Sequence, residues 1–400
     1  MDIQLCIVSG QPLPNLIPVL QFRPERVALV VSAAMKDAAD RFVGTLKSVG
    51  WTDQHIDRFE ELPSENYGQL VDFAMGVHEQ LTTNYPNARI IYNATGGNKL
   101  MALAFSQWFG SGEQHDMIYS DTANRRIEHL SAGRESIEPM ESVLSLDLYL
   151  NAQGKTVRSR QDTDEKWLEK AQLRKPATRF IAENASKIGG LVALFNKWYA
   201  PDNQGNVVPN VLRLDHPPRG DWRQALELLE QGQVLERGES AQEWFPRSSD
   251  AAVYLSGAWL EEFVWFAAKD AGAGDVGLSV EVTDNADNKS DIRNEMDVVA
   301  VHNNRLLMIE CKTGNLARDR KDEDIIYKLD SLRDQAGGLL GTAALVSFRA
   351  LDYSNKKGRK VNVRARAGSV SLLTCEAGEL SDLKKLMHNW VDRGEWVSTP

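Results

Sequence analysis

The sequence predicts an α/β protein in three parts: an open, mostly parallel sheet over residues 1–145, a small helical, winged-helix-like region over 146–250, and a second α/β domain over 251–400. Three observations predict this division. Apolar runs alternate with helical segments in the first part, helical periodicity dominates the middle, and two apolar runs in the last part flank a tight turn. A chain of 400 residues is also too long for one ordinary core.

In the first part, strand-like runs at residues 3–8, 26–32, 88–92 and 117–120 alternate with helical segments at 36–49 and 66–81. This order is typical of an open parallel sheet, in which ligands bind at the carboxyl ends of the strands. The loops that begin at Ser9, Ser32 and Asn93 follow three of these strands, so we expect a ligand site there.

The third loop carries the most informative chemistry. Gly96 and Gly97 stand just before a helix, where backbone N–H groups can approach an anion, and Thr95, Asn98 and Lys99 add side-chain donors. The G-x-x-x-x-G-K-[ST] spacing of a Walker A loop is absent. A Gly-Gly turn is often only a turn, but polar groups on three matching loops favour a ligand site. The candidate ligand-binding residues are Ser9, Gly10, Gln11, Pro12, Asn15, Ser32, Lys36, Asn93, Thr95, Gly96, Gly97, Asn98 and Lys99.

The middle region is predicted to be mainly helical. Its expected elements are helices at 163–174, 176–187, 189–199 and 222–235 and a strand-like run at 242–245. A helix followed by a short hairpin suggests a winged-helix-like module. Two roles stay open: a spacer that transmits motion between the outer domains, which we favour, and DNA recognition.

The last part is organised around a predicted β-hairpin. Its strands, at residues 294–302 and 305–312, flank Asn303-Asn304, and asparagine tolerates the positive φ that a two-residue turn demands. Counting outward from this turn places Asp297 directly opposite Glu310.

This register brings together groups suited to hydrolysis. Like charges that face each other across strands are destabilising, and a divalent cation would offset the repulsion between Asp297 and Glu310. Lys312 lies two residues beyond Glu310 and projects from the same face. Mg²⁺ or Mn²⁺ held by Asp297, Glu310 and the Cys311 carbonyl could activate a water that Lys312 orients, which predicts metal-assisted cleavage of a phosphodiester. The ordinary alternative is a surface ion pair at the end of an edge hairpin.

The helix predicted over residues 257–268 carries two adjacent glutamates. Apolar residues at helical spacing form its buried stripe, namely Leu260, Phe263, Val264 and Ala267. At about 100° per residue, Glu261 falls on the rim of this stripe, whereas Glu262 points the other way. Glu261 is therefore the glutamate that can reach a site beside the core, and Glu262 is expected to be a solvated charge.

Beyond the hairpin, a helix over 322–335 and a strand over 343–348 are predicted. Lys328 and Gln335 on that helix are second-rank candidates for the site. Cationic residues then crowd into 349–366, where only Asp352 opposes them. Lys356, Lys357, Arg359 and Lys360 are the candidate nucleic-acid-binding residues, and a solvated basic loop is the alternative.

Composition limits the possible functions. A net charge of −10 argues against a protein that coats nucleic acid, so such contacts must be local. The start of the chain lacks a basic leader, and no apolar run approaches the roughly 20 residues of a membrane span, so a soluble, cytoplasmic protein without a membrane partner is expected. Three cysteines are too few for a disulfide framework or a thiolate zinc site.

Two resemblances follow from these motifs. Asp297 with Glu310-Cys311-Lys312 resembles the signature of PD-(D/E)xK nucleases, except that Met296 replaces the usual proline. The loop Asn93-Ala94-Thr95-Gly96-Gly97-Asn98-Lys99 resembles the Gly-Gly loop of CARF domains, the Rossmann-like sensors of CRISPR-associated proteins. Both ends of the chain together resemble the single-CARF nucleases of type III CRISPR immunity.

Several further expectations follow from this resemblance alone. It implies a restriction-endonuclease-like fold in the last part, in which the helix before the hairpin supplies one more catalytic carboxylate, here Glu261. It also implies a DNA and/or RNA substrate and a cyclic oligoadenylate, cyclic tetra-adenylate first among them, as allosteric activator. It also implies a homodimer with the cyclic ligand on the two-fold axis between identical loops. The rivals are a repair or restriction-type nuclease regulated by another nucleotide, and a transcription regulator with an inactive nuclease fold. The intact Asp297, Glu310 and Lys312 argue against the regulator.

Overall fold

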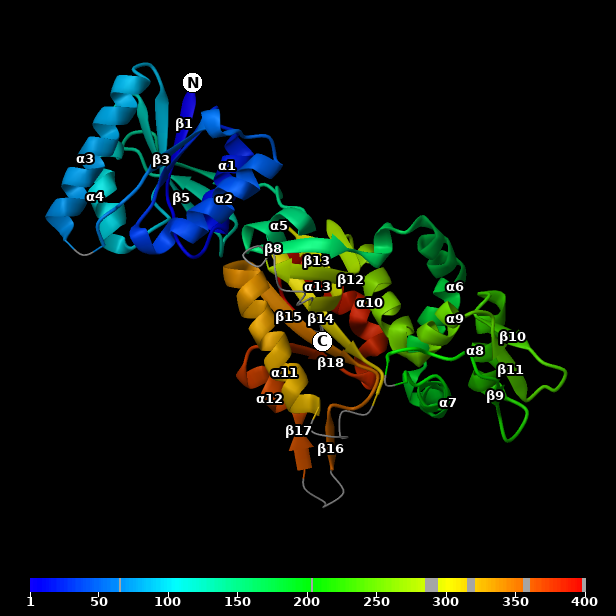
Figure 1. The fold of residues 1–400 in the computed structure, drawn as a ribbon. Helices are drawn as coiled ribbons and strands as arrows, with labels where there is room; N and C mark the ends of the chain where they lie inside the picture. The colour runs from blue at the N-terminus through cyan, green and yellow to red at the C-terminus, as the bar shows by residue number, and fades with distance from the viewer. Residues whose placement is uncertain (65, 203, 285–293, 315–320, 355–359, 398–400) are drawn as a thin grey trace. The chain divides into compact units, whose positions relative to one another are not determined.

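The computed structural model describes residues 1–64, 66–202, 204–284, 294–314, 321–354 and 360–397. The chain forms two compact units. The first is mainly Met1–Thr156, and the second is built from Val157–Thr283, Ser290–Gly337 and Gly341–Pro400. Both units are mixtures of helices and sheets (Figure 1), so the predicted α/β class is confirmed.

The first unit contains a seven-stranded sheet with the order β3-β2-β1-β4-β5-β6-β7. Its parallel strands are β1 (Asp2–Ile7), β2 (Arg26–Val30), β3 (Ile56–Phe59), β4 (Arg89–Asn93) and β5 (His115–Asp121), and β6 (Arg126–His129) and β7 (Ser136–Pro139) add an antiparallel edge. The central strands are almost wholly buried, as parallel strands covered on both faces are.

Helices cover both faces of this sheet. They are α1 (Leu13–Phe22), α2 (Lys36–Ser48), α3 (Tyr67–Asn84) and α4 (Lys99–Phe109), and a further helix, α5 (Leu146–Ala152), packs on α2. The pair α3 and α4 lies on one face, and α1 and α2 lie on the other (Figure 1). The carboxyl ends of β1, β2 and β4 therefore meet at one edge, where the three predicted loops lie.

The second unit begins with a helical region. Its elements are α6 (Glu165–Glu183), α7 (Ala185–Trp198), β9 (Leu212–Arg213), α8 (Gly220–Gln231), β10 (Leu235–Arg237) and β11 (Glu243–Pro246). The three strands form a small antiparallel sheet with the order β10-β11-β9, which gives the expected winged-helix-like arrangement.

The predicted helix break at Pro176 is wrong, because α6 continues through this proline. Ala171, Ala177 and Ile181 form a buried stripe along α6 that packs on α8 and α10. This packing holds one continuous helix and overrides the local preference of proline for a helix start.

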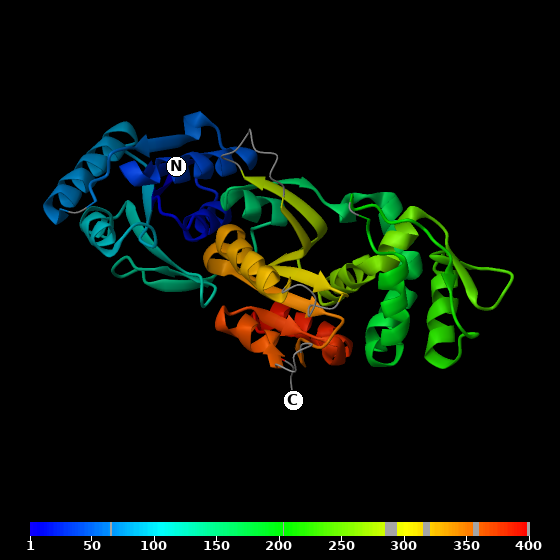
Figure 2. The same cartoon turned by 60° about the horizontal axis from the view of Figure 1, so that its bottom comes forward.

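The second sheet has six strands in the order β18-β15-β14-β13-β12-β8. They are β8 (Lys155–Ser159), β12 (Asp275–Asp284), β13 (Asn294–His302), β14 (Arg305–Lys312), β15 (Gly341–Ser347) and β18 (Leu373–Cys375). Helices α10 (Trp259–Asp270) and α13 (Leu383–Arg393) pack on one face, and α11 (Lys321–Leu332) lies on the other (Figures 1 and 2).

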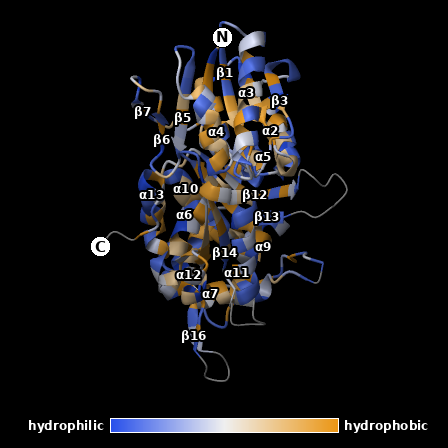
Figure 3. Ribbon diagram, turned by 90° about the vertical axis from the view of Figure 1, so that its left-hand side faces the viewer, coloured by the Kyte–Doolittle hydropathy of each residue, from blue (hydrophilic) through white to orange (hydrophobic). Residues whose placement is uncertain are grey.

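A single hydrophobic core joins the helical region to this sheet. It includes Ile181 on α6, Trp259 on α10, Ile309 on β14 and Trp390 on α13. Figure 3 shows hydrophobic residues gathered on the strands of each unit and hydrophilic residues on the outer loops. Within the described ranges, none of the helices combines the length and the apolar character that a bilayer crossing requires.

Candidate active site and candidate ligand loops

The β13–β14 hairpin turns at Asn303 and Asn304, whose φ values of 49° and 60° are those of a two-residue turn with both central residues left-handed. Pairing runs from His302 opposite Arg305 out to Val298 opposite Ile309. The predicted register is confirmed over this span, and one further step along both strands brings Asp297 beside Glu310.

The hairpin also brings the predicted lysine to these carboxylates. The Lys312 Nζ lies 2.6 Å from Glu310 Oε1 and 3.8 Å from Asp297 Oδ2. The backbone N–H of Cys311 donates a hydrogen bond of 2.7 Å to Asp297 Oδ2, which fixes the orientation of this carboxylate. The structure thus gathers Asp297, Glu310 and Lys312 in one cluster.

Glu261 reaches the same cluster from α10. A π-helical turn at Tyr254–Ala258 precedes this helix, and Gly257 in it passes so close to the residue that follows β14 that a Cβ there would lie 2.9 Å from Thr313 Oγ1. Glu261, Cys311, Lys312 and Thr313 line one cavity of about 780 Å³. The close approach of the turn to β14 therefore sets the position of Glu261.

The expectation for Glu262 is wrong. Its side chain is 1% exposed, and its Oε2 lies 2.6 Å from Arg174 Nη2 while its Oε1 accepts a hydrogen bond of 2.9 Å from Thr178. Both partners belong to α6. The carboxylate that points away from the cavity is therefore compensated inside the core and is not solvated.

Burial and mutual repulsion shape the charges of the cluster. Burial, together with the charge of Glu310, raises the pKa of Asp297 to about 6. Burial, together with the charge of Asp297, raises the pKa of Glu261 to about 8. Burial opposes the charge of Lys312, but the two carboxylates outweigh it and raise the pKa of Lys312. Three acidic groups around one ammonium leave this site short of positive charge.

One acidic residue at this site was missed from the sequence. Glu295 lines the same cavity and contributes to the raised pKa values of Asp297 and Glu261. It stands two residues before Asp297 on β13, so the same two-residue periodicity that paired Lys312 with Glu310 could have found it.

The remaining nuclease candidates lie elsewhere or outside the described residues. Lys328 and Gln335 are exposed and do not line the cavity, and Gln335 Nε2 donates to Ser331. Lys356, Lys357 and Arg359 lie outside the described residues. Lys360 is exposed at the start of β17 (Lys360–Asn362).

Two arginines of the basic segment 349–366 form ion pairs with carboxylates outside it. Arg364 lies 2.9 Å from a carboxylate oxygen of Glu379 and 3.4 Å from one of Glu376, and Arg366 lies 3.3 Å from Glu323. Asp352 is the only acidic residue within 349–366, but carboxylates from outside this segment also oppose its cations.

In the first unit, the Gly-Gly loop is tightly fixed. A Cβ at Gly96 would lie 2.1 Å from the Ile7 carbonyl oxygen, and Gly97 has a φ of 74°. Asn98 caps α4 by accepting a hydrogen bond of 3.0 Å from the Met101 N–H. Thr95 Oγ1 donates to Asn93 Oδ1 and accepts from the Ser120 N–H, each at 2.7 Å. Glycine is therefore required at both positions.

The candidate ligand residues divide into a frame and a rim. Asn15 and Asn93 are buried and donate to the carbonyls of Ile7 and Pro14, at 2.8 and 2.9 Å, so their side chains hold the loops together from below. The rim is formed by exposed residues after β1, β2 and β4, which are Gly10, Gln11, Lys36, Asn98 and Lys99. Ser9, Pro12, Ser32, Thr95 and Gly97 are half-buried beside them. Lys36 forms an exposed ion pair of 2.7 Å with Glu61.

Comparison with known folds supports both halves of this description. The chain is similar over 99% of its length to the whole of a crystal structure of protein VC1899 from Vibrio cholerae, with 21% identity and a TM-score of 0.82. It is similar over 97% of its length to all of Can2 from Sulfobacillus thermosulfidooxidans in complex with cyclic tetra-adenylate, with 23% identity and a TM-score of 0.70.

A third similar structure is a type III CRISPR defence DNA nuclease activated by cyclic oligoadenylate. It matches 86% of this chain and 45% of its own, with 14% identity and a TM-score of 0.51. At these identities the likeness establishes the fold alone. No curated protein sequence matches the chain.

Two family models match the sequence itself. The Card1 CARF domain matches residues 3–149, which include the Gly-Gly loop, and the Card1-like endonuclease domain matches residues 248–393, which include the hairpin and Glu261. The chain therefore combines a Card1-type CARF domain with a Card1-like endonuclease domain.

Proposed function

We propose that this chain is a metal-dependent endonuclease of type III CRISPR defence that a cyclic oligoadenylate activates. The observation that carries the proposal is the cluster of Asp297 and Glu310 around Lys312, which lines one cavity together with Glu261 in a domain that matches the endonuclease model. The Can2 structure contains cyclic tetra-adenylate, which supports that ring as the activator.

The donor set at the cavity fits a hard divalent cation. Among the described residues, no three His, Cys, Asp or Glu side chains are arranged to enclose a metal by themselves. Mg²⁺ and Mn²⁺ need fewer, because Mg²⁺ typically binds one or two carboxylates and keeps several waters. Asp297 and Glu310 would supply the carboxylates, the Cys311 carbonyl a further oxygen, and the shortage of positive charge would favour the cation.

The residues of the chain then have distinct roles. A bound cation would lower the pKa of a water and stabilise charge on the phosphate. The Cys311 N–H holds the Asp297 carboxylate in a fixed orientation beside Lys312. Lys312 can orient the attacking water or neutralise the phosphate oxygens. Glu261, with its raised pKa, can hold or accept a proton near neutral pH.

For the sensor we propose a homodimer in which two copies of the rim around Gly97 and Lys99 face one cyclic ligand. Helix starts and lysines attract the phosphates, and a closed two-fold arrangement suits a ligand made of repeated units. The substrate would be DNA and/or RNA in the cytoplasm. The similar DNA nuclease favours DNA, and the exposed Lys360 would contribute to phosphate contact with Lys356, Lys357 and Arg359.

The test is cleavage by the purified full chain. Single- and double-stranded DNA and RNA are incubated with Mg²⁺ or Mn²⁺, with and without cyclic tetra-adenylate, and with EDTA as a control. We expect cleavage that requires both the metal and the cyclic ligand. Equal cleavage without the ligand would remove the sensor role, and binding of ligand without any cleavage would favour a regulator with an inactive nuclease fold.

A further inference from the structure

A second cavity adjoins the candidate active site within the second unit. It has a volume of about 420 Å³ and shares Gln161, Asp164, Val253 and Ala258 with the cavity that contains Glu261 and Lys312. The two spaces are therefore neighbours on the same part of the surface. The volume lies in the range of sites that bind small organic groups.

Aromatic and apolar side chains form much of its wall. Trp167, on the first turn of α6, is half-buried and meets the ring of Trp265 edge-on, with centroids 5.4 Å apart at 81°. Tyr254 is buried and donates or accepts a hydrogen bond of 2.8 Å with Thr178 Oγ1. Leu278 is buried beside them. These contacts fix the aromatic surface before any ligand arrives.

The charges around this wall largely cancel, and one ammonium is left over. Lys170 lies 2.8 Å from Asp250, and the Asp164 carboxylate accepts hydrogen bonds from the N–H groups of Lys166 and Trp167 at the start of α6. The Lys166 side chain is exposed at the cavity and has no ion pair among the described residues. Arg174 and Glu262, which also line this space, are paired with each other at 2.6 Å. The result is a slot of mixed polarity that contains the half-buried ring of Trp167 and has one cation at its edge.

We propose that this slot is a subsite for one nucleobase of the substrate strand, next to the phosphate that is cleaved. The half-buried Trp167 ring with a nearby ammonium matches a base and its phosphate, because every base has a face that stacks on an aromatic ring. The proposal rests on the proposed nuclease function. It requires an unpaired nucleotide at this position, so the substrate strand must be single-stranded or locally opened there.

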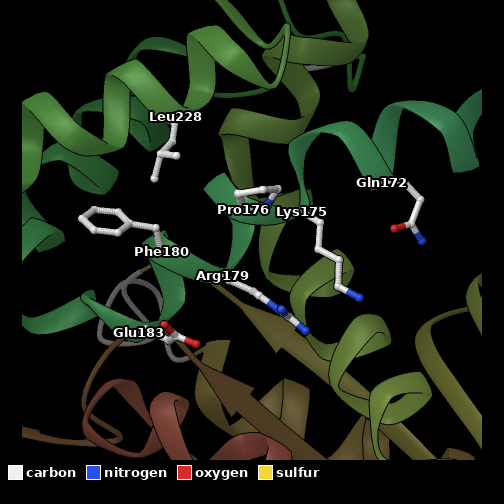
Figure 4. Close-up of a pocket in the computed structure, with 7 residues that line it drawn as sticks. All are labelled: Gln172, Lys175, Pro176, Arg179, Phe180, Glu183 and Leu228. Carbon is white, nitrogen blue, oxygen red and sulfur yellow. The ribbon is translucent and has the colours of Figure 1, made fainter.

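Another cavity on α6 does not share these properties. It lies further along the helix (Figure 4), is lined by Lys175, Arg179, Phe180 and Leu228 among others, and shares no residue with the active-site cavity. Its two cations are both paired with Asp270. Phe180 is a half-buried aromatic residue of the same helix and provides a matched control for Trp167.

The test is an abasic scan with the full chain, Mg²⁺ and saturating cyclic tetra-adenylate. The probe is a single-stranded oligodeoxynucleotide with one preferred cleavage bond, in which each nucleotide near that bond is made abasic in turn. For the wild type we expect one position where loss of the base raises KM about tenfold, as expected for loss of one stacked base. Trp167→Ala should raise KM for the intact probe about tenfold and abolish the effect of the abasic position.

Controls separate this proposal from simple damage to the fold. Trp167→Phe should restore most of the sensitivity to the abasic position, and Phe180→Ala should leave that sensitivity intact. If the wild type cleaves but no abasic position matters, or if Trp167→Ala keeps the full sensitivity, the subsite is wrong while the nuclease function stands. If the wild type does not cleave the intact probe or any other DNA or RNA, the nuclease function itself fails.

Discussion

The Lys312 ammonium lies 2.6 Å from a carboxylate oxygen of Glu310 on its own strand and 3.8 Å from Asp297 Oδ2 on the facing strand. The same two carboxylates raise its pKa, so this lysine stays charged at neutral pH although it is largely buried. A charged donor in this position can orient a water or neutralise a phosphate oxygen, and it also competes with a metal cation for the Glu310 carboxylate.

The first prediction concerns this lysine. Lys312→Ala should lower kcat about 100-fold or more, as expected for loss of a group that assists the chemical step. Binding of Mn²⁺ should stay or become tighter, because no ammonium competes for Glu310. Calorimetric titration with Mn²⁺ and cleavage at saturating substrate measure the two effects, with Lys384→Ala on the exposed side of α13 as control. An unchanged kcat would exclude Lys312 from the chemistry.

The second prediction concerns the carboxylates. Asp297→Asn or Glu310→Gln should lower cleavage more than about 100-fold, because each removes a proposed metal ligand. Unfolding in EDTA should occur at the same or a higher temperature than in the wild type, since repulsion within the cluster is relieved. Glu227→Gln, in an exposed ion pair on α8, should change neither property. Wild-type activity in either site variant contradicts the proposed mechanism.

The third prediction is a pH dependence of stability in the metal-free protein. The pKa values of about 6 for Asp297 and about 8 for Glu261 lie above the ordinary values of 3.8 and 4.5, so the folded state binds these protons more tightly than the unfolded state. Their contribution is fully present below about pH 4 and is lost as pH rises through 6 and 8.

Thermal unfolding in EDTA between pH 4 and pH 9 measures this effect. Asp297→Asn and Glu261→Gln should each flatten the decline at high pH, Asp297→Asn mainly around pH 6 and Glu261→Gln mainly around pH 8. Added Mg²⁺ should also flatten it, because a cation binds the deprotonated carboxylates. A wild-type profile that matches the double variant Asp297→Asn/Glu261→Gln would show that neither pKa is raised by folding.

The sequence predicts the site well where local periodicity determines it. The Asn303-Asn304 turn and the two-residue period of strands are enough to place Asp297, Glu310 and Lys312 together. The helical period is enough to show that Glu261 and Glu262 point in different directions from α10. These relationships depend on residues close in the sequence, so the geometry of the strand and the helix is enough to predict them.

The sequence predicts poorly those features that depend on contacts between residues far apart in the chain. Glu262 is neutralised by Arg174, which lies 88 residues earlier, and no local pattern reveals such a partner. The continuous α6 through Pro176 has the same origin, since its buried stripe is fixed by other helices. Strand β3, with the sequence IDRF, was missed because its partly exposed, charged residues show no clear alternation.

The fourth prediction concerns the basic segment. Neutralising Lys356, Lys357, Arg359 and Lys360 should weaken substrate binding and flatten its dependence on salt by about one unit of slope per lost phosphate contact. Cleavage at saturating substrate should be retained. Neutralising Arg364, which is already paired with Glu379, should alter the slope less. An unchanged slope in the quadruple variant would mean that this segment does not contact the substrate.

The last prediction concerns the sensor and its coupling to the nuclease. A ligand can shift the nuclease only if it binds one arrangement of the protein better than another, so loss of ligand contacts should remove activation and leave the chemistry intact. Lys99→Glu places a negative charge on the exposed start of α4, where a phosphate would bind. We expect it to abolish stimulation by cyclic tetra-adenylate while weak basal cleavage persists.

Gly97→Glu should have the same effect and should also strain the loop, because Gly97 has a φ of 74° and a Cβ there would lie 2.8 Å from Ile7 Cγ2. Lys99→Glu is therefore the cleaner variant, and Lys384→Glu controls for the change in net charge. The measurement is cleavage rate against cyclic tetra-adenylate concentration, with thermal unfolding to show that the variant folds. If Lys99→Glu responds to the ligand as the wild type does, the rim at α4 is not where the activator binds, because a reversed charge beside a bound phosphate must weaken binding.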